Sequence, residues 1–133
     1  MMRTKLFVGC AALAAGLSAN AEVLDGTKPI LCAALTAIVC DYQKDCVKGS
    51  PESINLPVFW RVDANKATVD SKRGGVERSS KVSNAVIEGT HVSVQGVEGG
   101  LAWSMSINKE TGRMTLSGSD DEGYVVFGAC EAI

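Results

Sequence analysis

Alternation of apolar and polar side chains marks the second half of the chain. The segment LAWSMSIN (101–108) has a large apolar residue at every second position, and Met114 and Leu116 resume the pattern after NKETG (108–112). Successive side chains of a β-strand point to opposite faces of the sheet. The pattern therefore predicts a β-hairpin with one buried face, turning at Thr111-Gly112.

Further hairpins are predicted upstream. In VFWRVD (58–63), Val58, Trp60 and Val62 share one face, and Phe59, Arg61 and Asp63 share the other. Ala64-Asn65 is the expected turn into a strand over residues 66–70. A second hairpin is expected around Gly89-Thr90, with His91 facing outward. The polar segment SKRGGVERSSK (71–81) is predicted to be a loop or a frayed edge.

The first part of the folded chain is harder to assign. ILCAALTAIVCD (30–41) is a continuous apolar run that suits either a buried helix or a buried strand. The β-branched pair Ile38-Val39 and the short loop after it favour a strand. Ser50 as the cap and Pro51 at the first helical position predict a single helical turn, and YVVFGAC (124–130) is the expected closing strand.

The N-terminus predicts export. Arg3 and Lys5 precede an alanine-rich apolar run that ends in Ala19-Asn20-Ala21, a pattern typical of a cleaved signal peptide. We expect a signal peptide over residues 1–21, a flexible arm over 22–29 and a single β domain over 30–133. Lipidation at Cys10 is a minor alternative. We expect no transmembrane segment and a periplasmic location.

Four cysteines remain after the predicted cleavage site: Cys32, Cys40, Cys46 and Cys130. An even number in an exported chain favours two disulfides. A bond between Cys32 and Cys40 is rejected, because eight residues of strand or helix hold their Cα atoms too far apart. We prefer Cys32–Cys130 with Cys40–Cys46, which leaves Cys32–Cys46 with Cys40–Cys130 as the alternative.

About eight short strands joined by short turns indicate an all-β protein. We expect an antiparallel up-and-down meander that forms a small closed or nearly closed barrel, because closure removes exposed sheet edges. A β-sandwich is the alternative. A disulfide between Cys32 and Cys130 would join the first strand to the last.

Several segments together resemble a known group of sequences. LCA, NLPVFWRVD, VQGVEGGLAWSMSINKETGRMTLSG and the terminal VVFGAC are similar to a family of small uncharacterised exported proteins of proteobacteria. Its members carry a W-S-x-x-I-x-x-x-T-G strand and turn and a terminal F-G-x-C. The resemblance implies a periplasmic location and no catalytic residue.

The sequence gives little support for catalysis or for a cofactor. Motifs of serine hydrolases, zinc proteases and nucleotide-binding proteins are absent from it. His91 is the only histidine, and we interpret it as a surface residue. Asp120, Asp121 and Glu122 could serve glycoside hydrolysis or hold calcium, but their place in one turn favours solvated charge. The formal charge of −2 gives no reason to bind nucleic acid.

Binding is therefore the expected function, with an envelope protein recognised through loops as the favoured form. The predicted contact residues are Lys72, Arg73, Arg78, Asp120, Asp121 and Glu122. One alternative is an apolar ligand in the barrel interior, lined by Trp60, Trp103, Met105 and Phe127. Another is a structural envelope protein that associates through faces bearing Phe59, Tyr124 or Tyr42.

Overall fold

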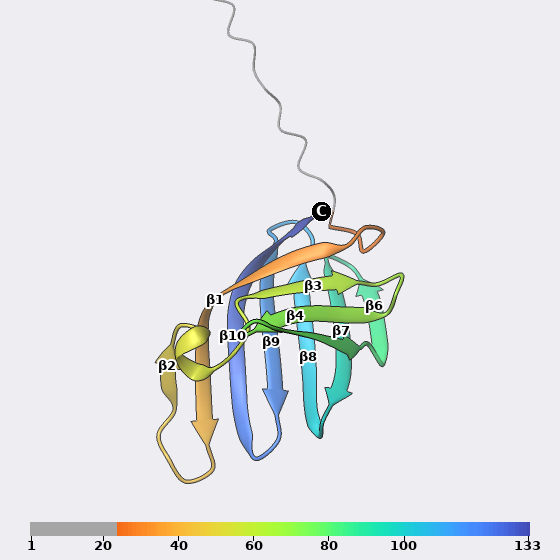
Figure 1. The fold of residues 1–133 in the computed structure, drawn as a ribbon. Helices are drawn as coiled ribbons and strands as arrows, with labels where there is room; N and C mark the ends of the chain where they lie inside the picture. Colours follow the sequence, from red (N-terminus) through yellow and green to blue (C-terminus); the bar gives the residue numbers. More distant parts are fainter. Residues whose placement is uncertain (1–23) are drawn as a thin grey trace, which may run out of the picture.

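Antiparallel strands make up most of residues 24–133, which are the residues that the computed structural model describes (Figure 1). The predicted signal peptide lies outside these residues. In chain order the elements are β1 (Ile30–Asp41), β2 (Val47–Gly49), the 3-10 helix η1 (Glu52–Ile54), β3 (Phe59–Asp63), β4 (Thr68–Arg73), β5 (Val76–Lys81), β6 (Asn84–Glu88), β7 (His91–Glu98), β8 (Leu101–Asn108), β9 (Arg113–Ser119) and β10 (Glu122–Ala132).

The described strands form one sheet in the order β5-β4-β3-β1-β10-β9-β8-β7-β6, with β2 paired to β1. The sheet curls so that β3, β4 and β5 cross in front of β7 to β10 (Figure 1). Residues 82 and 83 connect β5 to β6 at the two ends of the sheet order. Val82 N–H donates to Ala67 O next to β4 (2.8 Å), and Ser83 N–H donates to Gln95 O of β7 (2.8 Å). The predicted all-β meander is confirmed, and its form is a curled half-barrel of ten strands.

β1 holds the two parts of this sheet together. Its first residues, Ile30 to Ala33, pair with β3, whereas Ala37 to Val39 pair with β2, and both halves pair with β10 on the other side. Leu35 is bulged out of the pairing with β10 and is 68% exposed. Because a bulge bends its strand and increases the local twist, it lets the β3–β5 layer fold over the rest of the sheet.

Both predicted disulfides are present. Cys32 and Cys130 are direct partners across β1 and β10 and are bonded, and Cys40 and Cys46 close the tip of the β1–β2 hairpin. Disulfides form and persist in oxidising compartments, so these bonds indicate an extracytoplasmic environment.

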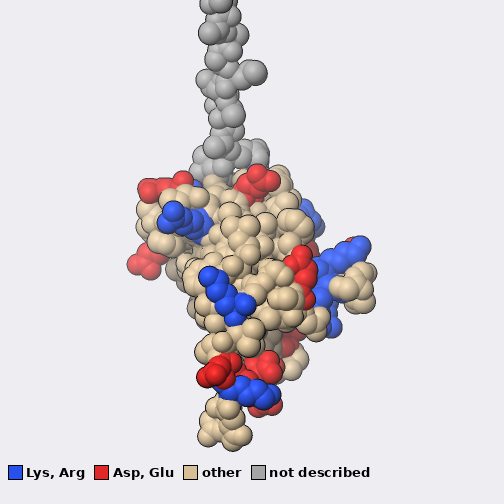
Figure 2. All heavy atoms as spheres, turned by 90° about the vertical axis from the view of Figure 1, so that its left-hand side faces the viewer, with Lys and Arg blue, Asp and Glu red and all other residues tan. Residues whose placement is uncertain are grey.

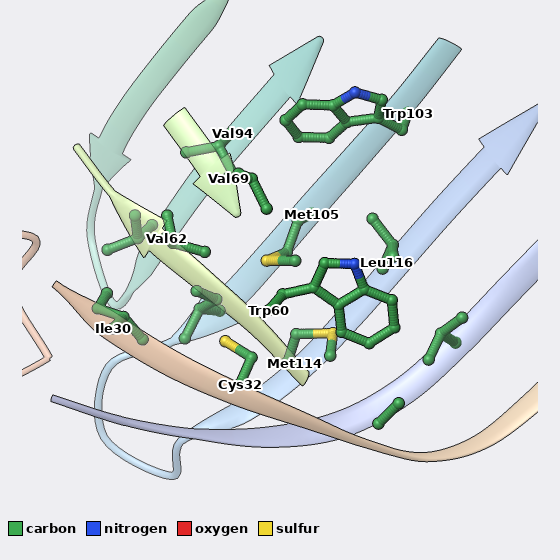
Figure 3. Close-up of a cluster of buried hydrophobic side chains, with 14 of the residues drawn as sticks. Ile30, Cys32, Trp60, Val62, Val69, Val94, Trp103, Met105, Met114 and Leu116 are labelled. Carbon is green, nitrogen blue, oxygen red and sulfur yellow. The ribbon is translucent and has the colours of Figure 1, made fainter. Parts of the chain in front are cut away.

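The inner face of the half-barrel forms the hydrophobic core (Figure 3). The predicted alternation in β8 is confirmed, because Trp103, Met105 and Ile107 are all buried. The other core residues are Leu24, Ile30, Cys32, Ala34, Ala37, Trp60, Val62, Val69, Val92, Val94, Met114, Leu116 and Val126.

Two local expectations differ from the structure in whole or in part. SKRGGVERSSK, expected to be a loop or a frayed edge, is a hairpin formed by the end of β4 and by β5, and β5 is an edge strand of the sheet. Asp63 does not share the exposed face of Phe59 and is 4% exposed, because its carboxylate accepts a hydrogen bond from Lys66 N–H (3.1 Å) in the following turn. Among the described residues of the segment 22–29, Leu24 belongs to the core, whereas Thr27 and Lys28 are exposed.

The two disulfides should contribute unequally to stability. Cys32–Cys130 closes a segment of 98 residues, and Cys40–Cys46 one of 6 residues. In the chain-entropy model these loops correspond to about 4.7 and about 2 kcal/mol. We expect Cys32→Ala with Cys130→Ala to lower the free energy of unfolding in urea by about twice as much as Cys40→Ala with Cys46→Ala. Equal losses would contradict the proposed role of the long-range bond.

Gly128 in β10 should tolerate no side chain, because it lies next to the β1 bulge. A Cβ atom there would lie 2.1 Å from the carbonyl oxygen of Ala33 and 2.8 Å from Met114 Cε. Gly128→Ala is expected to reduce the free energy of unfolding by roughly 1–3 kcal/mol. Gly123→Ala in the same strand is the control, since a Cβ there meets nothing within 4 Å. Equal stability of the two variants in urea would rule out this account of the bulge.

Candidate functional site

A half-open pocket lies between the β3–β5 layer and the inner faces of β7 to β10. It has a volume of about 110 Å³. Its lining residues are Leu56, Pro57, Trp60, Val69, Ser71, Arg73, Arg78, Ser80, Glu98, Leu101, Trp103, Met105, Leu116 and Tyr124. The lining therefore comes both from the strands that precede β1 in the sheet order and from the strands on the other side of β1, which begin with β10.

The floor of the pocket is apolar and comes from strands that cross one another. Trp60 of β3 lies near Leu116 (Figure 3), and Trp103 and Met105 of β8 with Val69 of β4 complete the apolar lining. Period-two alternation in β3 and β8 directs these side chains inward, as the sequence predicts. The floor is thus continuous with the hydrophobic core and is rigidly supported by the sheet.

Trp103 is held against the one residue of β7 that leaves room for its ring. Gly96 is its direct partner across the sheet, and a Cβ on Gly96 would lie 2.4 Å from Cζ2 of the indole and 2.5 Å from Lys81 O. The indole Nε1 is buried and has no hydrogen-bond partner among residues 24–133. In Figure 3 this nitrogen lies on the side of the ring facing away from Met105.

Charged side chains line the outer part of the pocket. Arg73 and Arg78 come from the β4–β5 hairpin, and Glu98 comes from the end of β7. The guanidinium of Arg73 donates a hydrogen bond from Nη1 to Asn55 O (3.0 Å), and Ser80 Oγ donates one to the Glu98 carboxylate. The mouth therefore carries both signs of charge above an apolar floor.

Tyr124 borders the pocket on the β10 side. Its ring packs on Gly118 of β9, where a Cβ would lie 2.3 Å from the phenol oxygen. Burial raises the pKa of the Tyr124 phenol, and the negative charges of Asp120 and Glu98 raise this pKa further. Tyr124 thus stays protonated at neutral pH and has a hydroxyl group that can donate a hydrogen bond at the pocket.

The basic residues predicted as contacts do not all face the pocket. Arg73 and Arg78 line it, whereas Lys72 lies beside Phe59 and Arg61 on the outer face of the sheet. This difference follows from alternation in β4, which sends neighbouring side chains to opposite faces.

The acidic residues predicted as contacts lie in and beside the β9–β10 turn. Asp120, Asp121 and Glu122 are exposed, and Asp120 Oδ1 accepts a hydrogen bond from Glu122 N–H (2.9 Å). Glu122 pairs with Asp41 at the end of β1, where Asp41 and Lys44 form an ion pair (2.8 Å). Acidic and basic side chains meet at this lower end of the molecule, which Figure 2 shows from the side.

Of the residues predicted to line a cavity, Trp60, Trp103 and Met105 do so, and Phe127 does not. Phe127 is 45% exposed and faces outward, because Val126 takes the inward position in β10. Tyr124, two positions before Val126, faces inward. The expectation that Tyr124 lies on an association face is wrong, since Tyr124 has the inward parity of Cys130 and lines the pocket. Sequence reasoning missed Ser80, Glu98 and Leu101.

The residues considered for catalysis or metal binding do not line the pocket. His91 is exposed, and its Nδ1 lies 3.1 Å from the hydroxyl oxygen of the neighbouring Thr90. Within residues 24–133, no three His, Cys, Asp or Glu side chains are grouped so that they could hold a metal ion. A membrane-spanning helix is likewise not found in that part of the chain.

Comparison of the chain with protein-family models, with curated proteins and with solved structures found no match.

Proposed function

We propose that the protein is a non-enzymatic binding module of the periplasm that recognises an envelope protein through the loops around the pocket mouth. The observation that carries this proposal is that one pocket joins Arg73 and Arg78 of the basic hairpin to the apolar floor formed by Trp60 and Trp103. Tryptophan and arginine are the residues that most often dominate the binding energy of protein interfaces.

The geometry of the loops supports recognition of a protein. The β1–β2, β7–β8 and β9–β10 turns all project at the lower end of the half-barrel (Figure 1). Tyr42 at the tip of the first turn is 88% exposed, and the Cys40–Cys46 disulfide closes this turn at its base. A rigid loop loses little conformational entropy on binding, which increases affinity.

Reversing the charge at the pocket mouth should abolish partner capture. We expect tagged protein carrying Arg73→Glu to lose a partner that the wild type retains from periplasmic extract of its own host, identified by cross-linking and mass spectrometry. Lys72→Glu is the matched control, because it changes the same charge on the adjacent residue, which faces away from the pocket. Equal capture by the two variants would exclude the mouth as the contact surface.

A small apolar ligand in the pocket is the second candidate. It is favoured by the burial of Trp60, Trp103 and Met105 around a space that is open on one side. Pockets that are mainly apolar with a few polar groups are typical of small-molecule sites.

Native mass spectrometry separates the two candidates. Protein purified from its own host should carry an added small-molecule mass if the second candidate is correct, and Trp103→Ala should reduce the bound fraction by more than half. A clean apo mass for the wild type would exclude the second candidate and leave protein recognition.

A further inference from the structure

We propose that the pocket binds the carboxyl-terminal residue of a partner protein, with an aliphatic side chain on the tryptophan floor and the free carboxylate at Arg73 and Arg78. This inference rests on the proposed function, because it takes the same pocket and the same kind of partner. It adds which part of the partner enters the pocket and which chemical groups that part must carry.

The apolar part of the pocket has room for one side chain. Its volume of about 110 Å³ is smaller than the roughly 150 Å³ of an apolar cavity that holds one benzene molecule. The space is half open and is bounded by Trp60 and Trp103, which are 6% and 8% exposed. A branched aliphatic side chain such as that of leucine would fill it, whereas most of a long acyl chain would stay in water.

Positive charge prevails among the described residues at the mouth. Arg73 and Arg78 line the pocket with one acidic residue, Glu98, although the whole chain has a formal charge of −2. Arg73 uses Nη1 on Asn55 O, but a guanidinium carries further N–H donors in a planar fork. These donors can hold a carboxylate, which arginine binds through two parallel hydrogen bonds.

The positive and negative groups lie toward opposite ends of the mouth. Ser80 of β5 donates a hydrogen bond to the Glu98 carboxylate, whereas Arg73 of β4 lies opposite Val76 of β5. Ser80 and Val76 are four positions apart, which corresponds to about 13 Å along a strand. A carboxylate bound at Arg73 therefore stays away from Glu98, and the repulsion between the two is small.

The polar groups of the mouth suit a peptide backbone. The Tyr124 hydroxyl can donate to a peptide carbonyl, and the Glu98 carboxylate and the Ser71 hydroxyl can accept from peptide N–H groups. A free fatty acid has no N–H group to offer them. A carboxylate and an apolar side chain on one carbon atom occur together at the end of a polypeptide. The small pocket, which combines arginine with an apolar floor, fits that combination.

The test compares three short peptides that are identical except at the carboxyl end. One ends in leucine with a free carboxylate, one in leucine amide, and one in glycine with a free carboxylate. Binding to the full-length protein without its predicted signal peptide is measured by calorimetry. We expect the leucine acid to bind about tenfold more tightly than either of the others, since each of these lacks one anchoring group. Equal affinity of the leucine acid and either control, or no binding, would overturn the inference.

Arg73→Gln and Lys72→Gln are the matched variants. Each removes one positive charge from β4, the first at the pocket and the second on the outer face. Arg73→Gln should reduce the preference for acid over amide to about twofold, and Lys72→Gln should keep it near tenfold. A change that only loosened the pocket would weaken both peptides alike. If Arg73→Gln does not fold, Arg78→Gln replaces it. A preference that neither arginine variant reduces would overturn the carboxylate contact.

Isocaproate tests whether the bound group belongs to a polypeptide. It carries the side chain and the carboxylate of leucine without a peptide bond. We expect it to bind about fivefold more weakly than the leucine acid peptide, because the backbone contacts at Tyr124 and Glu98 are lost. Equal affinity would assign the pocket to a free small acid and overturn the assignment to a chain end.

Adding the peptides to the capture experiment separates this inference from the proposed function. Release of the captured protein by the leucine acid, and not by the amide, supports both. Capture that depends on Arg73 but survives the leucine acid would refute only the inference, because the partner then enters through another segment. A preference for the acid without any captured protein would refute only recognition of an envelope protein.

Discussion

The pairing of β1 with β10 is the constraint on which the rest of the structure depends. The strands before β1 in the sheet order and those after β10 are joined along the ladder only by this pair among the described strands, and Cys32–Cys130 fixes its register. The pocket lies between these two groups of strands. If β1 and β10 separated, Trp60 and Arg73 would no longer face Trp103 and Tyr124, so the disulfide that stabilises the fold also assembles the candidate site.

Alternation predicts a strand well where one face is buried and the other is in water. β8 meets this condition, and its inward residues could be read directly from the sequence. β1 does not, because the bulge at Leu35 changes which positions face inward: Ile30, Cys32 and Ala34 are buried before it and Ala37 after it. A strand whose phase changes in the middle has no single period, and its continuous apolar run also suited a buried helix.

The site was predictable in part, for the same reason. Trp60 and Trp103 belong to strands with clear alternation. YVVFGAC has large side chains at both odd and even positions, so the sequence predicted Phe127 in the pocket lining, where the structure has Tyr124. Glu98 and Ser80 come together from β7 and β5, which are far apart in the sequence and adjacent only because the sheet curls. No local pattern encodes that curl. Only the three-dimensional structure therefore shows that the basic hairpin lies beside the tryptophan residues of the pocket floor.

The turns at the lower end of the half-barrel lie outside the layer that crosses in front of β7 to β10 (Figure 1). Gly99 and Gly100 have positive φ angles (56° and 88°) and open space where a Cβ would lie, and Tyr42 is almost fully exposed. Insertions or substitutions there would leave the core packing intact. The scaffold thus separates residues under folding constraint from residues free to diversify, so related chains could acquire different specificities by lengthening these turns.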